Sequence, residues 1–261
     1  MSESTRAIAT EPLLVIEDVA RFFGGVRAVD GVSFSVPRGS LTGLIGPNGA
    51  GKSSVLGMVA GAIRPDRGRI LLDGEDIAGL RPYEVARRGV IRTFQSASVF
   101  PHLTVLENLI LGVPPSSEES IRACFFARRS WKRTESEHVE AAREILGRLR
   151  LSAHGDTYAS DLSGGQKRLV EIGRAIMAKP RLLLLDEPMA GVSRTLAGPI
   201  EELIANLRLE GMTVVLIEHE LGLIDRLCSP VVVLAQGKVL MQGEMDELRA
   251  DPEVRRAYLV G

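Results

Sequence analysis

The sequence predicts an α/β fold, in which a mainly parallel β-sheet is covered by helices and interrupted by a helical insertion. Short apolar runs at Leu41–Ile45, Leu182–Leu185 and Thr213–Ile217 are typical of buried strands in such a sheet. Segments with helical spacing lie between these runs, and strands that alternate with helices favour a parallel arrangement. Between about 112 and 158 this alternation is replaced by an amphipathic pattern, which predicts the insertion.

The N-terminal part of the chain is expected to contain three further strands and one helix. The strands share β-branched residues with partial alternation and are Leu13–Val19, Val32–Val36 and Ile70–Leu72. Helical spacing begins near Val55 and closes at Gly61. Turn residues predict a turn at Pro65–Gly68 and a tight turn at Asp73-Gly74.

The rest of the chain is expected to be mostly helical, with one hairpin. A loop is predicted at Pro114–Ser117, and a helix follows whose apolar residues keep a 3.6-residue period, namely Val139, Ala142, Ile145, Leu146 and Leu149. Ile200–Leu207 also has helical spacing. Val231–Leu234 and Val239–Met241 predict a hairpin about Gln236-Gly237-Lys238.

Composition limits the classes of protein that fit. The 261-residue chain has a formal net charge of −1, so no global field favours nucleic acid. Its apolar runs are far shorter than the roughly 20 residues that a membrane-spanning helix needs, and Met1 to Glu11 lacks the apolar stretch of a secretory signal. Cys124 and Cys228 lack metal-ligand spacing and fit a reducing compartment. Any membrane role must therefore come through partners.

A complete phosphate-binding P-loop follows the first apolar run, as Gly46-Pro47-Asn48-Gly49-Ala50-Gly51-Lys52-Ser53. Its glycines let backbone N–H groups converge on phosphate oxygens, and the helix after it adds the positive end of its dipole. Lys52 is expected to reach the β- and γ-phosphates, and the Ser53 hydroxyl to ligate Mg²⁺. The alternative, a glycine-rich turn without function, is disfavoured because the motif lies between a strand and a helix.

Two acidic residues end the strand Leu182–Leu185. Asp186 is expected to hold Mg²⁺, directly or through water, because a strand that stops at the phosphates positions the metal. Glu187 can polarise an attacking water. A helix cap or a solvated turn is the alternative for two acids here, and the P-loop makes it the weaker one.

A third motif points to a family. The segment Leu162-Ser163-Gly164-Gly165-Gln166 matches the signature sequence of the ATP-binding-cassette (ABC) ATPases letter for letter, and Pro180 and the strand that ends at Glu187 follow at the family's spacing. Ser163 and Gln166 also form a capping box at the start of a predicted helix, whose N-terminus with two glycines is an anion site. The chain resembles these ATPases from about Leu13 to Gly261.

The resemblance implies an α/β fold with a P-loop NTPase (RecA-like) core, an N-terminal antiparallel β subdomain and an inserted helical subdomain. A single ABC ATPase domain would span residues 12–261. Within it, 12–94 and 162–243 would form the nucleotide-binding core with the β subdomain, 95–161 the helical subdomain and 244–261 a C-terminal tail.

The resemblance also implies roles for single residues. Gln95 is similar to the glutamine that senses Mg²⁺ and water and links to the transmembrane partner, and His219 to the switch histidine that contacts the γ-phosphate. Phe23 resembles the aromatic residue that stacks on adenine; Phe22 is a neighbouring candidate, and one of the two rings can equally be core. The signature segment would complete the nucleotide site of a partner subunit.

The expected site falls into three sets. The catalytic residues would be Glu187, His219 and Lys52. The nucleotide-binding residues would be Phe23, Gly46, Pro47, Asn48, Gly49, Ala50, Gly51, Lys52, Ser53, Ser54, Gln95, Ser163, Gly164, Gly165 and Gln166, and the metal ligands Ser53, Gln95 and Asp186.

Four segments and the insertion resemble ATPase subunits of branched-chain amino-acid importers: Phe23-Gly24-Gly25, Arg92–Gln95, Leu103–Leu109 and Asp251–Leu259. The implied function is ATP-driven uptake of hydrophobic amino acids, with ATP and Mg²⁺ as cofactors. Urea or short-amide importers are the second interpretation, and an exporter or a soluble ABC ATPase is less favoured. The implied partners are two transmembrane permease subunits, a second ATPase subunit that is identical or different, and indirectly a periplasmic or lipoprotein substrate-binding protein. The chain would be cytoplasmic, on the cytoplasmic face of the cell membrane.

Two segments leave alternatives open. The loop Pro188–Ser193 lacks the aspartate of the commonest family form, which leaves its contact between subunits in doubt. The stretch Ile121–Thr134 contains five basic residues, no acidic one and three aromatic rings. It would contact anionic headgroups or the permease, or it is an ordinary solvated helix with a few core rings.

Overall fold

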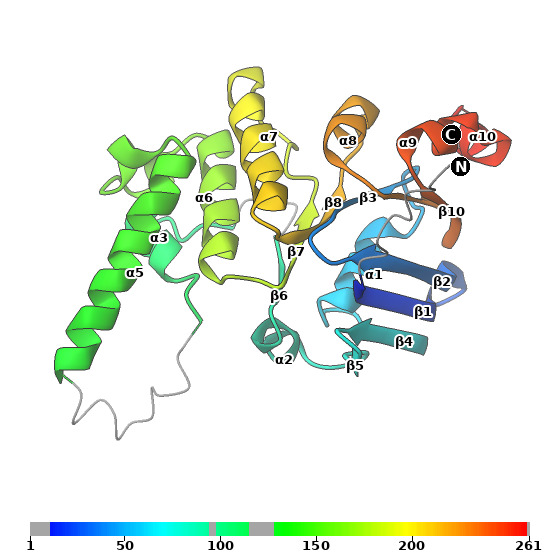
Figure 1. Cartoon of the computed structure of the whole chain (residues 1–261), viewed down its shortest axis with the longest axis horizontal. Helices are drawn as coiled ribbons and strands as arrows, with labels where there is room; N and C mark the ends of the chain where they lie inside the picture. Colours follow the sequence, from blue (N-terminus) through cyan, green and yellow to red (C-terminus); the bar gives the residue numbers. More distant parts are fainter. Residues whose placement is uncertain (1–10, 94–97, 115–127, 260–261) are drawn as a thin grey trace, which may run out of the picture.

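The computed structural model describes residues 11–93, 98–114 and 128–259. Its centre is a six-stranded sheet in the order β10-β9-β3-β8-β7-β6, beside a four-stranded sheet in the order β2-β1-β4-β5 (Figure 1). The strands are β1 (Pro12–Phe23), β2 (Val26–Pro37), β3 (Leu41–Ile45), β4 (Arg67–Leu72), β5 (Glu75–Asp76), β6 (Val90–Arg92), β7 (Leu182–Asp186), β8 (Thr213–Ile217), β9 (Val231–Ala235) and β10 (Lys238–Gly243). The central sheet is parallel except for β10, and the smaller sheet is antiparallel.

Helices cover the central sheet and form a group at one end of the molecule. Their bounds are α1 (Lys52–Val59), α2 (Pro82–Arg87), α3 (Val105–Ile110), α5 (Arg128–Arg148), α6 (Gly164–Met177), α7 (Arg194–Leu209), α8 (Leu221–Leu227), α9 (Met245–Ala250) and α10 (Pro252–Leu259). Helices α3, α5 and α6 pack together at the opposite end from the antiparallel sheet (Figure 1). The P-loop NTPase core, the antiparallel β subdomain and the helical insertion are thus confirmed.

The central sheet separates two hydrophobic cores, because successive side chains of a strand point to opposite faces. On β7, Leu183 and Leu185 lie in the core that includes α6 and α7. Leu182 and Leu184 lie in the core that includes α1 and the antiparallel sheet. Burial on both faces explains why this strand is continuously apolar rather than alternating.

Most predicted elements are present, many with longer bounds. The strand expected at Val32–Val36 begins at Val26, and the helix of the insertion is α5. The turn predicted at Pro65–Gly68 is wrong at its end, because Arg67 already pairs with Ala20 of β1. Strand β6 was not predicted, since three residues give too little pattern to distinguish a strand. The limits proposed for the subdomains stay predictions.

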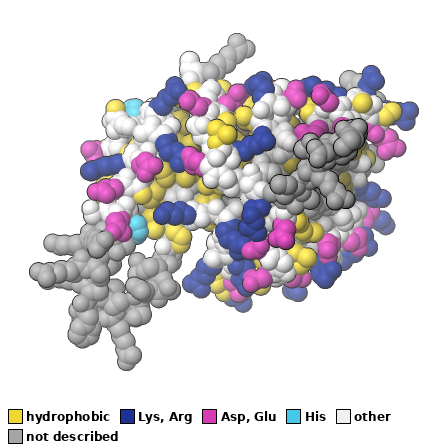
Figure 2. All heavy atoms as spheres, in the orientation of Figure 1, with side chains coloured by type: hydrophobic (Ala, Val, Ile, Leu, Met, Phe, Trp, Pro, Cys, Tyr) yellow, Lys and Arg dark blue, Asp and Glu magenta, His cyan; other side chains and the backbone are white. Residues whose placement is uncertain are grey.

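Among the described residues, no helix combines the length and the apolar character that crossing a bilayer requires. The face in Figure 2 carries basic and acidic side chains interspersed over its surface, with hydrophobic side chains gathered between the helical group and the rest of the molecule. Part of the basic stretch Ile121–Thr134 lies outside the described residues.

Candidate functional site

The P-loop has the backbone conformation that its glycines make possible. It joins the end of β3 to the start of α1, so the N-terminus of that helix faces the loop. Gly46 has φ +152°, and a Cβ there would lie 2.1 Å from the carbonyl oxygen of Leu234. Gly51 has φ +101°, and a Cβ there would lie 2.4 Å from the carbonyl oxygen of Ala28. Only glycine fits either position, which is the backbone wrapping that a phosphate cradle requires.

A cleft of about 500 Å³ opens over this loop. It is lined by Val26, Arg27, Ala28, Asn48, Gly49, Ala50, Gly51, Lys52, Ser53, Ser54, Glu187 and Gln236. The lining residues that were not predicted from the sequence include Arg27, at the start of β2, and Gln236, in the turn of the β9–β10 hairpin. The neighbouring Gly237 N–H donates to the Ala50 carbonyl over 3.1 Å, so this turn also holds the P-loop.

Phe23 is not among the residues that line the cleft. Its side chain is 45% exposed, and the Arg21 guanidinium lies 4.8 Å from the centre of its ring. Phe22 is exposed as well, with Arg27 over its ring. Neither ring is core, so the core alternative is wrong for both, and the adenine-stacking role of Phe23 stays a prediction.

Lys52 lines the cleft and is almost fully buried. Its Nζ donates to the carbonyl oxygens of Gly46, over 2.7 Å, and of Pro47, over 3.1 Å. Burial lowers the pKa of Lys52, while the charges of Glu187 and Asp186 act to raise it. The ammonium is therefore held by the loop itself, beside the space that phosphates would occupy.

Asp186 ends β7 with one carboxylate oxygen paired and the other not. Its Oδ2 accepts a hydrogen bond from Arg92 of β6 over 2.7 Å in a mostly buried ion pair. Its buried Oδ1 has no hydrogen-bond partner among the described residues. A buried carboxylate oxygen without a partner is costly unless a cation or water completes it, so this donor fits Mg²⁺.

Glu187 and His219 form a pair at the edge of the cleft. His219 Nε2 lies 2.9 Å from Glu187 Oε1. Glu187 has φ +48°, uncommon for a residue other than glycine, and its N–H donates to the carbonyl of Ile217. A carboxylate beside an imidazole, facing a phosphate cradle, can orient and polarise a water molecule.

The loop after Glu187 is held by two buried charged residues that the sequence analysis missed. Arg168 of α6 donates to main-chain carbonyls of this loop, and Glu218 accepts the N–H of Met189 over 2.8 Å. Arg168 and Glu171 lie three residues apart on the buried face of a helix. A charged pair among apolar core positions is a signal that could have drawn attention to them.

The unfolding free energy of Glu218→Gln relative to wild type is expected to rise with pH, although the amide gives up one of the two oxygens that accept the N–H groups of Met189 and His219. Burial raises the pKa of Glu218, with the Glu187 charge acting in the same direction, so ionising this carboxyl costs more in the folded than in the unfolded chain. Stability is then lost as pH rises above the unfolded value of roughly 4.3, and a neutral amide removes that loss.

Urea unfolding of both proteins at several pH values checks this result. The difference in unfolding free energy, variant minus wild type, should reach its lowest value as pH falls below about 4, where wild-type Glu218 becomes protonated in both states. The exposed Glu144→Gln serves as the control and should show no such pH-dependent difference. A stability difference between the two proteins that stays constant from about pH 4 to pH 7 would contradict the expectation.

The signature segment begins α6 as the capping box predicted. Ser163 is the N-cap: its Oγ accepts the Gln166 N–H, and Gln166 Oε1 accepts the Ser163 N–H over 2.9 Å. Ser163 and Gly164 are exposed, and Gly165 packs against Leu196. The four residues do not line the P-loop cleft, so one chain does not bring its signature segment and its P-loop together. Gln95 lies outside the described residues.

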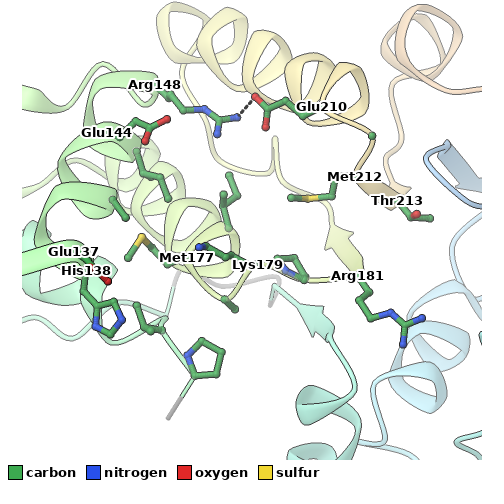
Figure 3. Close-up of a pocket in the computed structure, with 18 of the residues that line it drawn as sticks. Glu137, His138, Glu144, Arg148, Met177, Lys179, Arg181, Glu210, Met212 and Thr213 are labelled. Carbon is green, nitrogen blue, oxygen red and sulfur yellow. Dashed lines mark hydrogen bonds and ion pairs between the residues drawn. The ribbon is translucent and has the colours of Figure 1, made fainter. Parts of the chain in front are cut away.

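A larger hollow, of about 820 Å³, lies elsewhere (Figure 3). One face of α5 lines it together with the residues before β7 and β8, which are the amino ends of these strands. Its charged side chains are partly paired with one another, as Arg148 is with Glu210 over 2.7 Å. It contains no P-loop residue and lies at the end of the sheet away from Asp186, so it is not the candidate site.

Comparisons with known proteins find similar sequences over almost the whole chain. The ABC transporter family matches residues 29–190. The probable branched-chain amino acid transport ATP-binding protein LivG of Methanocaldococcus jannaschii is 37% identical over 96% of this chain and 98% of its own length. The high-affinity branched-chain amino acid transport ATP-binding protein BraF of Pseudomonas aeruginosa is 38% identical over the same shares, and LivG of Escherichia coli is 36% identical.

Solved structures of ABC transporter cassettes are also similar to this chain over nearly its whole length. The ADP conformation of an ATP-binding cassette of an ABC transporter is 37% identical, with a TM-score of 0.82 over 97% of this chain and 100% of that one. A nucleotide-free cassette from an ABC transporter is also 37% identical, with a TM-score of 0.80 over 95% and 98%.

Proposed function

This chain belongs to the ABC transporter family as one of its ATP-hydrolysing cassettes, and we propose that it powers the uptake of branched-chain amino acids through separate membrane subunits. The observation that carries the catalytic part is the Glu187–His219 pair at the P-loop cleft. The amino-acid substrate rests on the names of relatives that match almost the whole chain.

The P-loop would bind the phosphates of ATP. Lys52 Nζ would turn from the carbonyls of Gly46 and Pro47 to the β- and γ-phosphates, which replace those neutral acceptors with charged ones. Ser53 and Asp186 would hold Mg²⁺, which when bound offsets the negative charge of the phosphates. The unpartnered Oδ1 of Asp186 supports this assignment.

Glu187 would orient the water that attacks the γ-phosphate. Its hydrogen bond with His219 holds the carboxylate at the cleft. The imidazole, which is half exposed, would contact the γ-phosphate as well. Lys52 would meet the charge that spreads over the phosphate oxygens in the transition state.

Two chains would close head to tail around two nucleotides. The segment Ser163–Gly165, whose first two residues are exposed, lies at the N-terminus of α6 and outside its own chain's cleft. Its position supports this arrangement, because a helix N-terminus offers N–H donors to a phosphate held by another chain. The second ATPase subunit would be identical or different. The two permease subunits would receive the motion through Gln95 and the segment 96–108, and a substrate-binding protein would act with them. The chain would work on the cytoplasmic face of the membrane.

Uptake measurements test the substrate. Deleting the coding sequence should abolish uptake of radiolabelled leucine, isoleucine and valine, and wild-type chain should restore it while Lys52→Ala does not. Loss of urea or amide uptake alone would support the second interpretation instead. Unchanged uptake of all these solutes would contradict the importer.

Recovery of the complex tests the partners. Tagged chain purified from detergent-solubilised native membranes should bring with it two polytopic proteins and a second ATPase, identified by mass spectrometry. Recovery of the chain without any membrane protein would leave its assignment as an ATPase intact and would favour a role as a soluble ABC ATPase.

A further inference from the structure

Arg168 is a buried arginine of α6 that holds the backbone of the catalytic loop. Its side chain is 3% exposed. Its Nη2 donates to the carbonyl oxygens of Asp186, over 2.7 Å, and Glu187, over 2.8 Å, and its Nε donates to that of Pro188, over 3.3 Å. Its Nη1 pairs with Glu171 Oε2 over 2.7 Å. One guanidinium therefore binds three consecutive carbonyls at the end of β7.

These contacts determine where the Glu187 carboxylate lies. Glu187 stands in the left-handed region, where a residue other than glycine stays only if its surroundings hold it. The carbonyls on both sides of this turn are bound by Arg168, and Glu218 binds the N–H of Met189 beyond it. Loosening the guanidinium would let the turn relax and move the carboxylate away from the cleft.

The same helix begins with the signature segment. Ser163 is the N-cap of α6, and Arg168 follows five residues later, little more than one helical turn away. The capping box and the buried Arg168–Glu171 pair tie this stretch into one rigid unit. A displacement of the exposed N-terminus of α6 is therefore carried to Arg168 and to the carbonyls that it binds.

We propose that Arg168 is a positioning residue that couples the signature end of α6 to Glu187 of the same chain. The inference rests on the proposed function, in which Ser163–Gly165 contacts the nucleotide held by a second chain. Binding of that nucleotide at the signature segment of this chain would then set the position of this chain's own catalytic carboxylate, so that the two nucleotide sites of the dimer are linked through each Arg168.

The first test compares ATP binding with turnover in Arg168→Lys. Lysine keeps a positive charge beside Glu171 but lacks the fork that binds several carbonyls. The kcat for ATP hydrolysis should fall roughly 100-fold, as displacement of a catalytic group by about 1 Å can produce. The Kd for ATP should stay within about twofold of the wild-type value, because Lys52 and the N–H donors of the P-loop are unchanged. Arg148→Lys, which alters a matched 2.7 Å ion pair away from the site, should change neither quantity.

The second test is a double-mutant cycle between Ser163→Ala and Arg168→Lys, with kcat as the readout. Coupling predicts that the loss caused by Ser163→Ala is several-fold smaller when Arg168 is already replaced. If Arg168→Lys does not fold, Glu171→Gln takes its place in both tests, since it keeps the guanidinium and weakens only its anchor; its effect on kcat should have the same sign and be smaller.

The outcomes separate this inference from the function on which it rests. All rates are measured on the full chain in the complex recovered with it. Active wild-type protein with additive effects of the two substitutions, or with an unchanged kcat in the folded Arg168 variant, would overturn the coupling alone. A parallel fall of ATP binding and kcat would also overturn it, since that pattern indicates general loss of structure. Wild-type protein without ATPase activity would overturn both proposals.

Discussion

Glu187→Gln is expected to lower the rate of ATP hydrolysis by about 10²–10⁴-fold, the contribution typical of a general base, while ATP binding is retained. The amide has nearly the same shape and can still contact His219 Nε2, which lies 2.9 Å from the carboxylate. It has lost the basic oxygen that polarises water. Because the P-loop and Lys52 are untouched, nucleotide still enters the cleft and the complex accumulates before the chemical step.

Steady-state phosphate release and equilibrium binding of ATP, measured side by side, check this result. Glu144→Gln, an exposed carboxylate on α5, is the matched control and should leave both quantities unchanged. Turnover retained within about threefold, far below a general base's usual contribution, would mean that another residue or the γ-phosphate itself accepts the proton. His219→Ala would then become the more informative variant.

Lys52→Ala is expected to act earlier, by weakening nucleotide binding itself. A charge-assisted hydrogen bond contributes about 1.5–3 kcal/mol, so the Kd for ATP should rise roughly 10- to 100-fold. The change also removes the two hydrogen bonds that the ammonium donates to the carbonyls of Gly46 and Pro47. Turnover at saturating ATP should fall as well, because the same charge faces the transition state.

Calorimetric titration with ATP separates the two effects. Lys179→Ala, at the opposite end of the sheet, removes an equal charge and should leave the Kd unchanged. An ATP affinity that is unaltered in Lys52→Ala would show that the backbone amides alone hold the phosphates and that the lysine serves only the chemical step.

The parts of the site that could be predicted from sequence are those in which neighbours along the chain form the structure. The P-loop and the capping box of Ser163 and Gln166 each lie within eight consecutive residues, so local geometry determines them. The role of Glu187 was inferred from its place at the end of an apolar strand and that of His219 from family resemblance, but the contact between the two was not predicted. Its geometry depends on two parallel strands ending side by side, which the apolar runs predict in general but not in register.

Contacts that depend on tertiary structure could not be predicted from the sequence. Arg92 pairs with Asp186 across 94 positions, and it stands on β6, a strand too short to give a pattern. Arg168 was passed over because an arginine in an amphipathic helix is usually on the solvated face. Gln236 reaches the cleft because a hairpin turn far along the chain contacts the P-loop, and Arg27 reaches it because β2 begins beside that turn.

The contacts that hold the P-loop affect how the free energy of nucleotide binding is used. The Lys52 ammonium binds the carbonyls of Gly46 and Pro47, and the Gly237 N–H binds that of Ala50, so the loop is held in one shape before ATP arrives. The entropy of ordering it is lost when the chain folds and is not lost again in each cycle. More of the free energy of nucleotide contact is then available to drive movement of the elements around the loop, and each turnover can begin from the same starting shape.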